Sequence, residues 1–270
     1  LNVIDMKFQG ELKWKPFRKV ELSALGAYKY STTTQSHNIT DFSNQAWAYR
    51  AMDDATMRDA NPWLYTDPDK VNSLPVSVLP VGGFYRETKY GMTSYDFRAT
   101  ASYNDVFNEK HIFNFFGGME LNATDRTKTW FEGVGLQYDM GMLASYDYLY
   151  FKQGREENAD YYTVEMTRSR DVAFFGTATY SYAGKYTFNG TVRYEGSNKL
   201  GKSRAARWLP TWNVSAAWNA HEESWFENLR PALSNLTLKA SYSLTADRGP
   251  AEVSNSRVII KSYNPYRPFA

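Results

Sequence analysis

Residues 172–194 read VAFFGTATYSYAGKYTFNGTVRY, which is two stretches of alternating apolar and polar side chains joined at Ala183 and Gly184. Successive side chains of a β-strand point to opposite faces, so each stretch has one apolar and one polar face. The alternation therefore predicts an antiparallel hairpin with one face in water. The residues on its apolar face are Val172, Phe174, Gly176, Ala178, Tyr180 and Tyr182 before the turn, and Tyr186, Phe188, Gly190, Val192 and Tyr194 after it.

The same alternation recurs along the chain and predicts eight strands. Each is longer than the roughly 9 to 11 residues with which a tilted strand crosses a bilayer, and Trp or Tyr lies near many of the ends. A soluble sheet rarely repeats this pattern so often, so we predict an all-β protein, an antiparallel transmembrane β-barrel segment. The predicted strands are residues 3–15, 19–32, 92–104, 110–124, 170–183, 185–196, 207–219 and 235–246.

The composition agrees with a barrel and argues against other classes. The 270 residues have a formal net charge of +2 without a basic cluster, so nucleic acid is not expected as a partner. The mean hydropathy of −0.58 suits strands in which lipid-facing and lumen-facing residues alternate, and no apolar run is long enough for a transmembrane helix. Aromatic residues make up 17% of the chain, as is typical of membrane interfaces. The chain has no Cys and therefore no thiolate metal site.

Two very long connections, 33–91 and 125–169, alternate with short ones. Outer-membrane barrels have short periplasmic turns and longer extracellular loops, so we expect both long connections to be extracellular. The whole chain, residues 1–270, is then part of one transmembrane β-barrel domain. The short links are 16–18, 105–109 and 183–184, and the other segments expected outside are 197–206 and the residues after 247.

One motif suggests nucleotide chemistry, but its context argues against it. Residues 196–203, GSNKLGKS, have the spacing of a phosphate-binding P-loop. Such a loop needs a helix directly after it, whereas residues 207–219 contain Pro210 and alternate as a strand does. The three histidines have no metal-ligand spacing. We therefore predict no catalytic site, cofactor or metal, and expect that the protein is not an enzyme.

Four aromatic side chains in the predicted long loops are candidates for contact with a solute or a partner. Flat aromatic surfaces can stack against sugar rings or anchor a partner protein. The alternative is a small hydrophobic cluster that holds the loops together. The four residues are Trp47, Trp63, Tyr65 and Trp130.

Residues 193–226, RYEGSNKLGKSRAARWLPTWNVSAAWNAHEESWF, resemble the signature of the SusC/RagA family of TonB-linked outer-membrane proteins. In that signature a strand end of the form R-x-D/E-G-S leads to R-W and Pro, then to an alternating strand that ends in A-x-W, and then to a turn with Glu and Phe. The detailed resemblance covers about residues 162–250, and the earlier residues match in architecture. The signature positions are filled by Arg193, Glu195, Gly196, Ser197, Arg207, Trp208, Pro210, Ala216, Trp218, Glu223 and Phe226.

This resemblance implies a barrel of about 22 strands whose lumen holds a plug domain. It also implies import of nutrients, as oligosaccharides or peptides, across the outer membrane of a Bacteroidetes-type bacterium. The implied partners are a SusD-like surface lipoprotein, TonB, outer-membrane lipid and the imported solute. The plug domain and the TonB-contacting segment would lie outside residues 1–270, which would supply barrel wall and extracellular loops.

In such a wall, polar side chains on the lumen face would line the solute path or contact the plug. Lumen-facing positions follow from the alternation, because they are the neighbours of the apolar residues in each strand. The candidates are Lys7, Glu11, Asp96, Arg98, Lys185 and Arg193.

Two alternatives remain open at this stage. The first is a self-contained eight-stranded barrel that serves as an adhesin or structural protein, because side chains fill the interior of a barrel of that size. The second is a soluble carbohydrate-binding β-sandwich, which would not depend on detergent.

Overall fold

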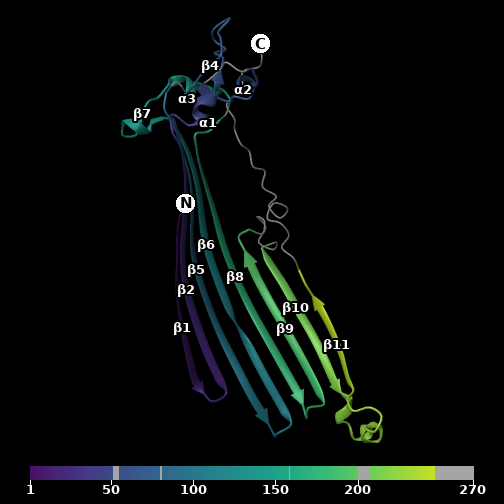
Figure 1. Cartoon of the computed structure of the whole chain (residues 1–270). Helices are drawn as coiled ribbons and strands as arrows, with labels where there is room; N and C mark the ends of the chain where they lie inside the picture. Colours follow the sequence, from purple (N-terminus) through teal and green to yellow (C-terminus); the bar gives the residue numbers. More distant parts are fainter. Residues whose placement is uncertain (51–54, 80, 158, 200–206, 247–270) are drawn as a thin grey trace.

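The computed structural model describes residues 1–50, 55–79, 81–157, 159–199 and 207–246. In this part of the chain eight strands form one antiparallel sheet in the order β1-β2-β5-β6-β8-β9-β10-β11, and the short β7 (Leu143–Ala144) pairs with β6 (Figure 1). All eight predicted strands are confirmed. They are β1 (Asn2–Phe17), β2 (Val20–Ile39), β5 (Gly83–Phe107), β6 (His111–Gln137), β8 (Tyr162–Tyr182), β9 (Tyr186–Ser197), β10 (Trp208–Asn219) and β11 (Thr237–Leu244).

The two ends of the sheet differ in what connects the strands (Figure 1). At one end, called the turn end, links of two or three residues join β1 to β2, β5 to β6 and β8 to β9. The longer link from β10 to β11 at this end contains the 3-10 helices η2 (Ala220–Glu222) and η3 (Ser224–Leu229). The opposite end is called the cap end. It has α1 (Asn44–Arg50), α2 (Ala55–Asp59), β3 (Leu64–Tyr65), β4 (Val76–Ser77), η1 (Tyr138–Met140) and α3 (Tyr148–Glu156).

The strand register confirms the predicted faces. One row across the sheet joins Ala24, Ala99, Met119, Phe174 and Tyr194, which are partners in successive pairs from β2 to β9. Partners in register point to the same face of a sheet, so the apolar sets of the strands gather on one face. The polar sets gather on the other.

Four strands extend well beyond their predicted ends, toward the cap. β2 continues to Ile39, β5 starts at Gly83, β6 continues to Gln137 and β8 starts at Tyr162. The expected loop ranges 33–91 and 125–169 therefore contain paired strand, and the connections proper are 40–82 and 138–161. In β2, β5 and β6 the alternation stops but the hydrogen-bonded pairing continues, which is why the pattern missed these three extensions. In β8 the same parity continues back through Met166, Val164 and Tyr162, which predicts that this strand projects beyond the membrane, and the structure confirms the extension.

The apolar face forms a band whose height matches a membrane. In β6 the side chains on this face are apolar from Phe113 to Ala123 and change to polar at Asp125. At about 3.3 Å per residue this stretch is about 33 Å long, and at a tilt of about 40° it spans about 25 Å of membrane. Large side chains in the band are exposed, and the exposed fraction is 40% for Phe115 and 47% for Phe174. Such a broad exposed apolar surface requires lipid or a partner to cover it.

The sheet is open rather than closed. β1 and β11 are its two edges, and no pairing joins them among the residues that the structure describes. A self-contained eight-stranded barrel needs that pairing, and a β-sandwich needs two stacked sheets, so the described residues support neither alternative. No helix in the described ranges has the length and apolar character that a membrane crossing requires. Residues 200–206 and 247–270, also expected outside, lie beyond the described residues.

The close approach of β5 to β6 gives a test of the wall. A Cβ atom on Gly118 would lie 2.1 Å from the backbone oxygen of Ala99, whereas one on Gly190 would have nothing within 4 Å. We expect Gly118→Ala to destabilise the folded protein by about 1–3 kcal/mol, because the two strands must move apart. The measurement is the temperature at which the folded band disappears on a semi-native gel. Gly190→Ala is the matched control, and an equal effect of both variants would contradict the expected clash.

Candidate functional site

A charged cluster lies on the polar face, at the middle of the sheet. The Glu120 carboxylate on β6 pairs with Arg98 on β5 at 3.2 Å and with Arg193 on β9 at 3.2 Å. Arg193 also pairs with Glu195 at 2.9 Å. β8 lies between β6 and β9, and its small Ala173 is the register partner of both Glu120 and Glu195, so Arg193 can reach across.

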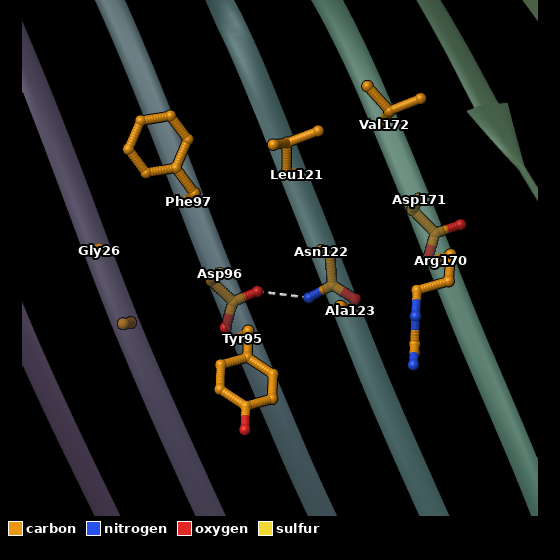
Figure 2. A pocket seen from close by; sticks show the side chains of 11 residues that line it. Gly26, Tyr95, Asp96, Phe97, Leu121, Asn122, Ala123, Arg170, Asp171 and Val172 are labelled. Atoms are coloured by element: carbon orange, nitrogen blue, oxygen red, sulfur yellow. Dashed lines mark hydrogen bonds between the residues drawn. The ribbon is translucent and has the colours of Figure 1, made fainter.

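A ladder of neutral and acidic polar groups continues this cluster toward the cap end. The Asn122 amide donates to the Asp96 carboxylate, as Figure 2 shows, and Ser94 and Thr124 bond through their hydroxyls at 3.0 Å. On β8, Ser169 donates to Asp171 at 2.8 Å. Figure 2 also shows the apolar side chains of the same strands, among them Phe97, Leu121 and Val172.

Toward the turn end the polar face is lined mainly by hydroxyl and amide groups. Among them are bonds between Ser23 and Thr100 at 2.8 Å, between Thr177 and Thr191 at 3.3 Å, and between Ser181 and Thr187 at 3.1 Å. These groups are neutral donors and acceptors that water or a polar solute can also satisfy. The face as a whole is therefore a polar wall with a band of charge at its middle.

The structure brings together some of the predicted lumen residues and separates others. Asp96, Arg98 and Arg193 lie in the cluster and ladder, while Lys7 and Glu11 share the polar face on the edge strand β1. Lys185 lies in the β8–β9 turn, outside the strands. The alternation already assigns Glu120 to the polar face, but only the register shows that it lies between two arginines.

At the cap end the two long connections form one packed unit, which we call the cap (residues 40–82 and 138–161 as described). Its hydrophobic core contains Ile39, Ala46, Leu79, Phe84 and Val134, so it grows directly from the extended strands. The aromatic rings of Tyr49, Trp63 and Tyr150 pack against this core, with Trp63 stacked on Tyr150 at 5.6 Å.

Polar contacts lock the two halves of the cap together. Lys152 of α3 pairs with Asp67 and, at 2.9 Å, with Asp69. The hydrogen bond from Lys152 lowers the pKa of Asp67, and the same contact raises the pKa of Lys152. Tyr65 donates to Glu156 at 2.5 Å, and burial with this bond raises the pKa of Tyr65 to about 12. These contacts give the cap a defined shape.

The four aromatic candidates have different surroundings. Trp63 packs against the cap core and Tyr65 is buried, as in the alternative of a cluster that holds the loops together. Trp47 on α1 is 58% exposed and so is available for contact. The loop placement of Trp130 was wrong, because it lies within β6 and pairs with Thr88 and Thr163. The extension of β6 beyond its alternating part explains the error.

At the turn end, Glu223 joins the η2–η3 connection to the wall. Its carboxylate accepts from Lys185 at 2.7 Å, from the Tyr186 hydroxyl at 2.6 Å and from the Trp218 indole N–H at 3.3 Å. The bonds from Lys185 and Tyr186 lower the pKa of Glu223 to about 2. Lys185 therefore serves this contact rather than the middle of the polar face.

The P-loop-like motif and the histidines find no support as chemical sites. Gly196 and Ser197 end β9, residues 200–203 of the motif lie outside the described ranges, and the following residues 208–219 form β10 instead of a helix. In the described part of the chain no group of three or more His, Asp or Glu side chains is placed to hold a metal ion.

An antiparallel sheet with an apolar band of membrane height on one face and a polar, charged face on the other is the wall of a transmembrane β-barrel. Residues 7–261 match the family described as TonB dependent receptor-like, beta-barrel. Because the match covers most of the chain, the protein belongs to this family, whose members are outer-membrane receptors and transporters rather than enzymes.

Two relatives carry the resemblance further. The chain is 25% identical to TonB-dependent receptor P39 of Formosa agariphila over 176 residues, which are 64% of this chain and 16% of that protein. It is 29% identical to TonB-dependent receptor SusC of Bacteroides thetaiotaomicron over 86 residues, 32% of this chain and 8% of that protein. The predicted membership of the SusC/RagA family is thereby confirmed.

Solved structures show the same fold. The structure of the RagAB peptide transporter matches 89% of this chain with a TM-score of 0.60 at 18% identity. The structure of the RagAB peptide importer in the closed-closed state matches 89% of this chain with a TM-score of 0.59. The chain covers 22% of the matched chain in both. It thus spans less than a quarter of the length of these relatives.

The Lys152 contacts predict that the cap can be loosened without disturbing the sheet. Lys152→Met removes the pairs with Asp67 and Asp69, so we expect the connection 138–161 to be cut by chymotrypsin about tenfold faster. The control is Lys70→Met, because Lys70 is exposed and lies 3.7 Å from Asp67. Equal cleavage rates for the two variants would show that the ion pairs of Lys152 do not hold the two connections together.

The low pKa of Glu223 predicts an acid-dependent contribution to stability. A carboxyl whose folded pKa is about 2, below its ordinary value of 4.5, stabilises the fold above pH 4.5 and loses that effect as pH falls toward 2. The melting temperature of Glu223→Gln should therefore lie below that of the native protein at pH 6, and the difference should shrink toward pH 2. A difference that stays constant would refute this. Glu227→Gln, at an exposed position, is the control.

Proposed function

We propose that this chain forms part of the wall and the extracellular side of a SusC-like, TonB-dependent transporter that imports oligosaccharides or peptides across the outer membrane. The observation that carries the proposal is the charged cluster of Arg98, Glu120 and Arg193 on the face opposite the lipid band. Charged groups at membrane depth are costly unless they face water or protein, so this face borders a lumen.

The open edges support a larger barrel than the described strands can form. Among the described residues, β1 and β11 each have a strand partner on one side only, and within a membrane the backbone groups of the other side need a partner too. Barrels of about 22 strands have a lumen that must be plugged. In this proposal the plug domain and the TonB-contacting segment belong to other parts of the full-length protein, and the polar face lines the solute path or contacts the plug.

The cap is the proposed extracellular part. Connections 40–82 and 138–161 lie at the end of the sheet opposite to the short turns, as extracellular loops do in outer-membrane barrels. The polar extensions of β5 and β6 raise the cap above the lipid band. We propose that a SusD-like lipoprotein sits against the cap, with the exposed Trp47 as one contact.

The proposal is tested on the full-length protein from its own outer membrane. In mild detergent a SusD-like lipoprotein should co-elute with it, and cells should take up labelled oligosaccharides or labelled peptides only while TonB is present. Uptake of one class and not the other identifies the substrate. Uptake that is unchanged after deletion of the gene, for both classes, would overturn the import function. If the lipoprotein does not co-elute in mild detergent, the proposed association with a SusD-like lipoprotein is overturned.

A further inference from the structure

The connection from β10 to β11 differs from every other described link at the turn end. The other links have two or three residues, whereas residues 220–236 fold into η2, η3 and a short return (Figure 1). Phe226 and Ala220 in this segment are fully buried, so it is a packed structure and not a simple turn. We call residues 220–236 the rim segment.

The rim segment is attached to the apolar face of the wall. Glu223 accepts hydrogen bonds from the side chains of Tyr186 and Trp218, which are register partners in the apolar row nearest the turn end. The ring of Trp225 lies 6.3 Å from that of Trp218. These contacts place Glu223 and Trp225 beside the apolar face at the turn end.

The rim segment has an apolar and a polar side. The 3-10 helix η3 has about three residues per turn, so Ser224 and Glu227 share one stripe, which is polar. Trp225 and Leu229 lie on other stripes, and they remain 48% and 46% exposed although they are apolar. An exposed Trp next to a lipid band is typical of a membrane interface, where its ring meets lipid and its N–H meets water.

We infer that the rim segment is an interfacial membrane anchor, with Trp225 and Leu229 inserted among the phospholipids of the leaflet at the turn end. This inference rests on the proposed function, because it requires the apolar band to face lipid. Lipid is the occupant that the geometry favours, because the exposed Trp225 continues the apolar face beyond Trp218. The anchor would set the depth of β10 and β11 in the bilayer.

The test is nitroxide accessibility on the full-length protein in phospholipid vesicles. These 270 residues contain no Cys, so each spin label is attached to one introduced Cys, in Trp225→Cys or Leu229→Cys. Glu227→Cys is the control on the polar stripe, and Phe188→Cys is the marker of the lipid band. Collisions with oxygen report lipid, and collisions with a water-soluble nickel chelate report water. We expect the oxygen-to-nickel ratio at 225 and 229 to exceed that at 227 by at least fivefold.

The outcomes separate the inference from the function on which it rests. A lipid-like ratio at 188 with water-like ratios at 225 and 229 would overturn the anchor and leave the membrane wall intact. A water-like ratio at 188 would overturn the membrane wall itself. Leu229→Cys keeps the contact of Trp225 with Trp218, so the ratio at 229 still tests the anchor if Trp225→Cys fails to fold.

Discussion

The register of the strands is the constraint on which the rest of the structure depends. Phe97 and Arg98 are neighbours in β5, yet one faces the apolar band and the other pairs with Glu120 on the polar face. A shift of one residue would exchange them and place charge in lipid. The hydrogen-bonded ladder therefore does two things at once. It satisfies the backbone, as a membrane requires, and it sorts the side chains between lipid and water.

The upper edge of the band is defined by charge as much as by the loss of apolar residues. Arg170 pairs with Asp125 at 2.7 Å on the face that is apolar further down. Beyond this pair both faces of β2 and β6 carry mostly polar side chains, whereas β8 keeps Met166, Val164 and Tyr162 on the side of the band. The paired sheet continues past the edge of the band as a wall of its own. The cap is built on that wall, because Ile39, Phe84 and Val134 at the ends of the strands form its core.

The ion pairs of the charged cluster hold their charged side chains in place more than they stabilise the fold. Arg98, Glu120 and Arg193 are each between 33% and 49% exposed at their side chains, and ion pairs with that much access to water contribute little to stability. Their arrangement across four strands instead keeps two guanidinium groups and a carboxylate at fixed places on the polar face. Such fixed charges suit contact with a polar solute or with a plug.

The sequence by itself determined the strands, their faces and the family, because alternation is a local property and the signature of residues 193–226 is contiguous. It indicated the extension of β8 through Met166 and Val164, but not those of β2, β5 and β6, where the alternation is lost, and Trp130 was misplaced for that reason. Only the tertiary structure joined Lys152 to Asp67, 85 residues away, and Lys185 to Glu223. Contacts between distant segments depend on how the strands bring their ends together, and no local pattern records that.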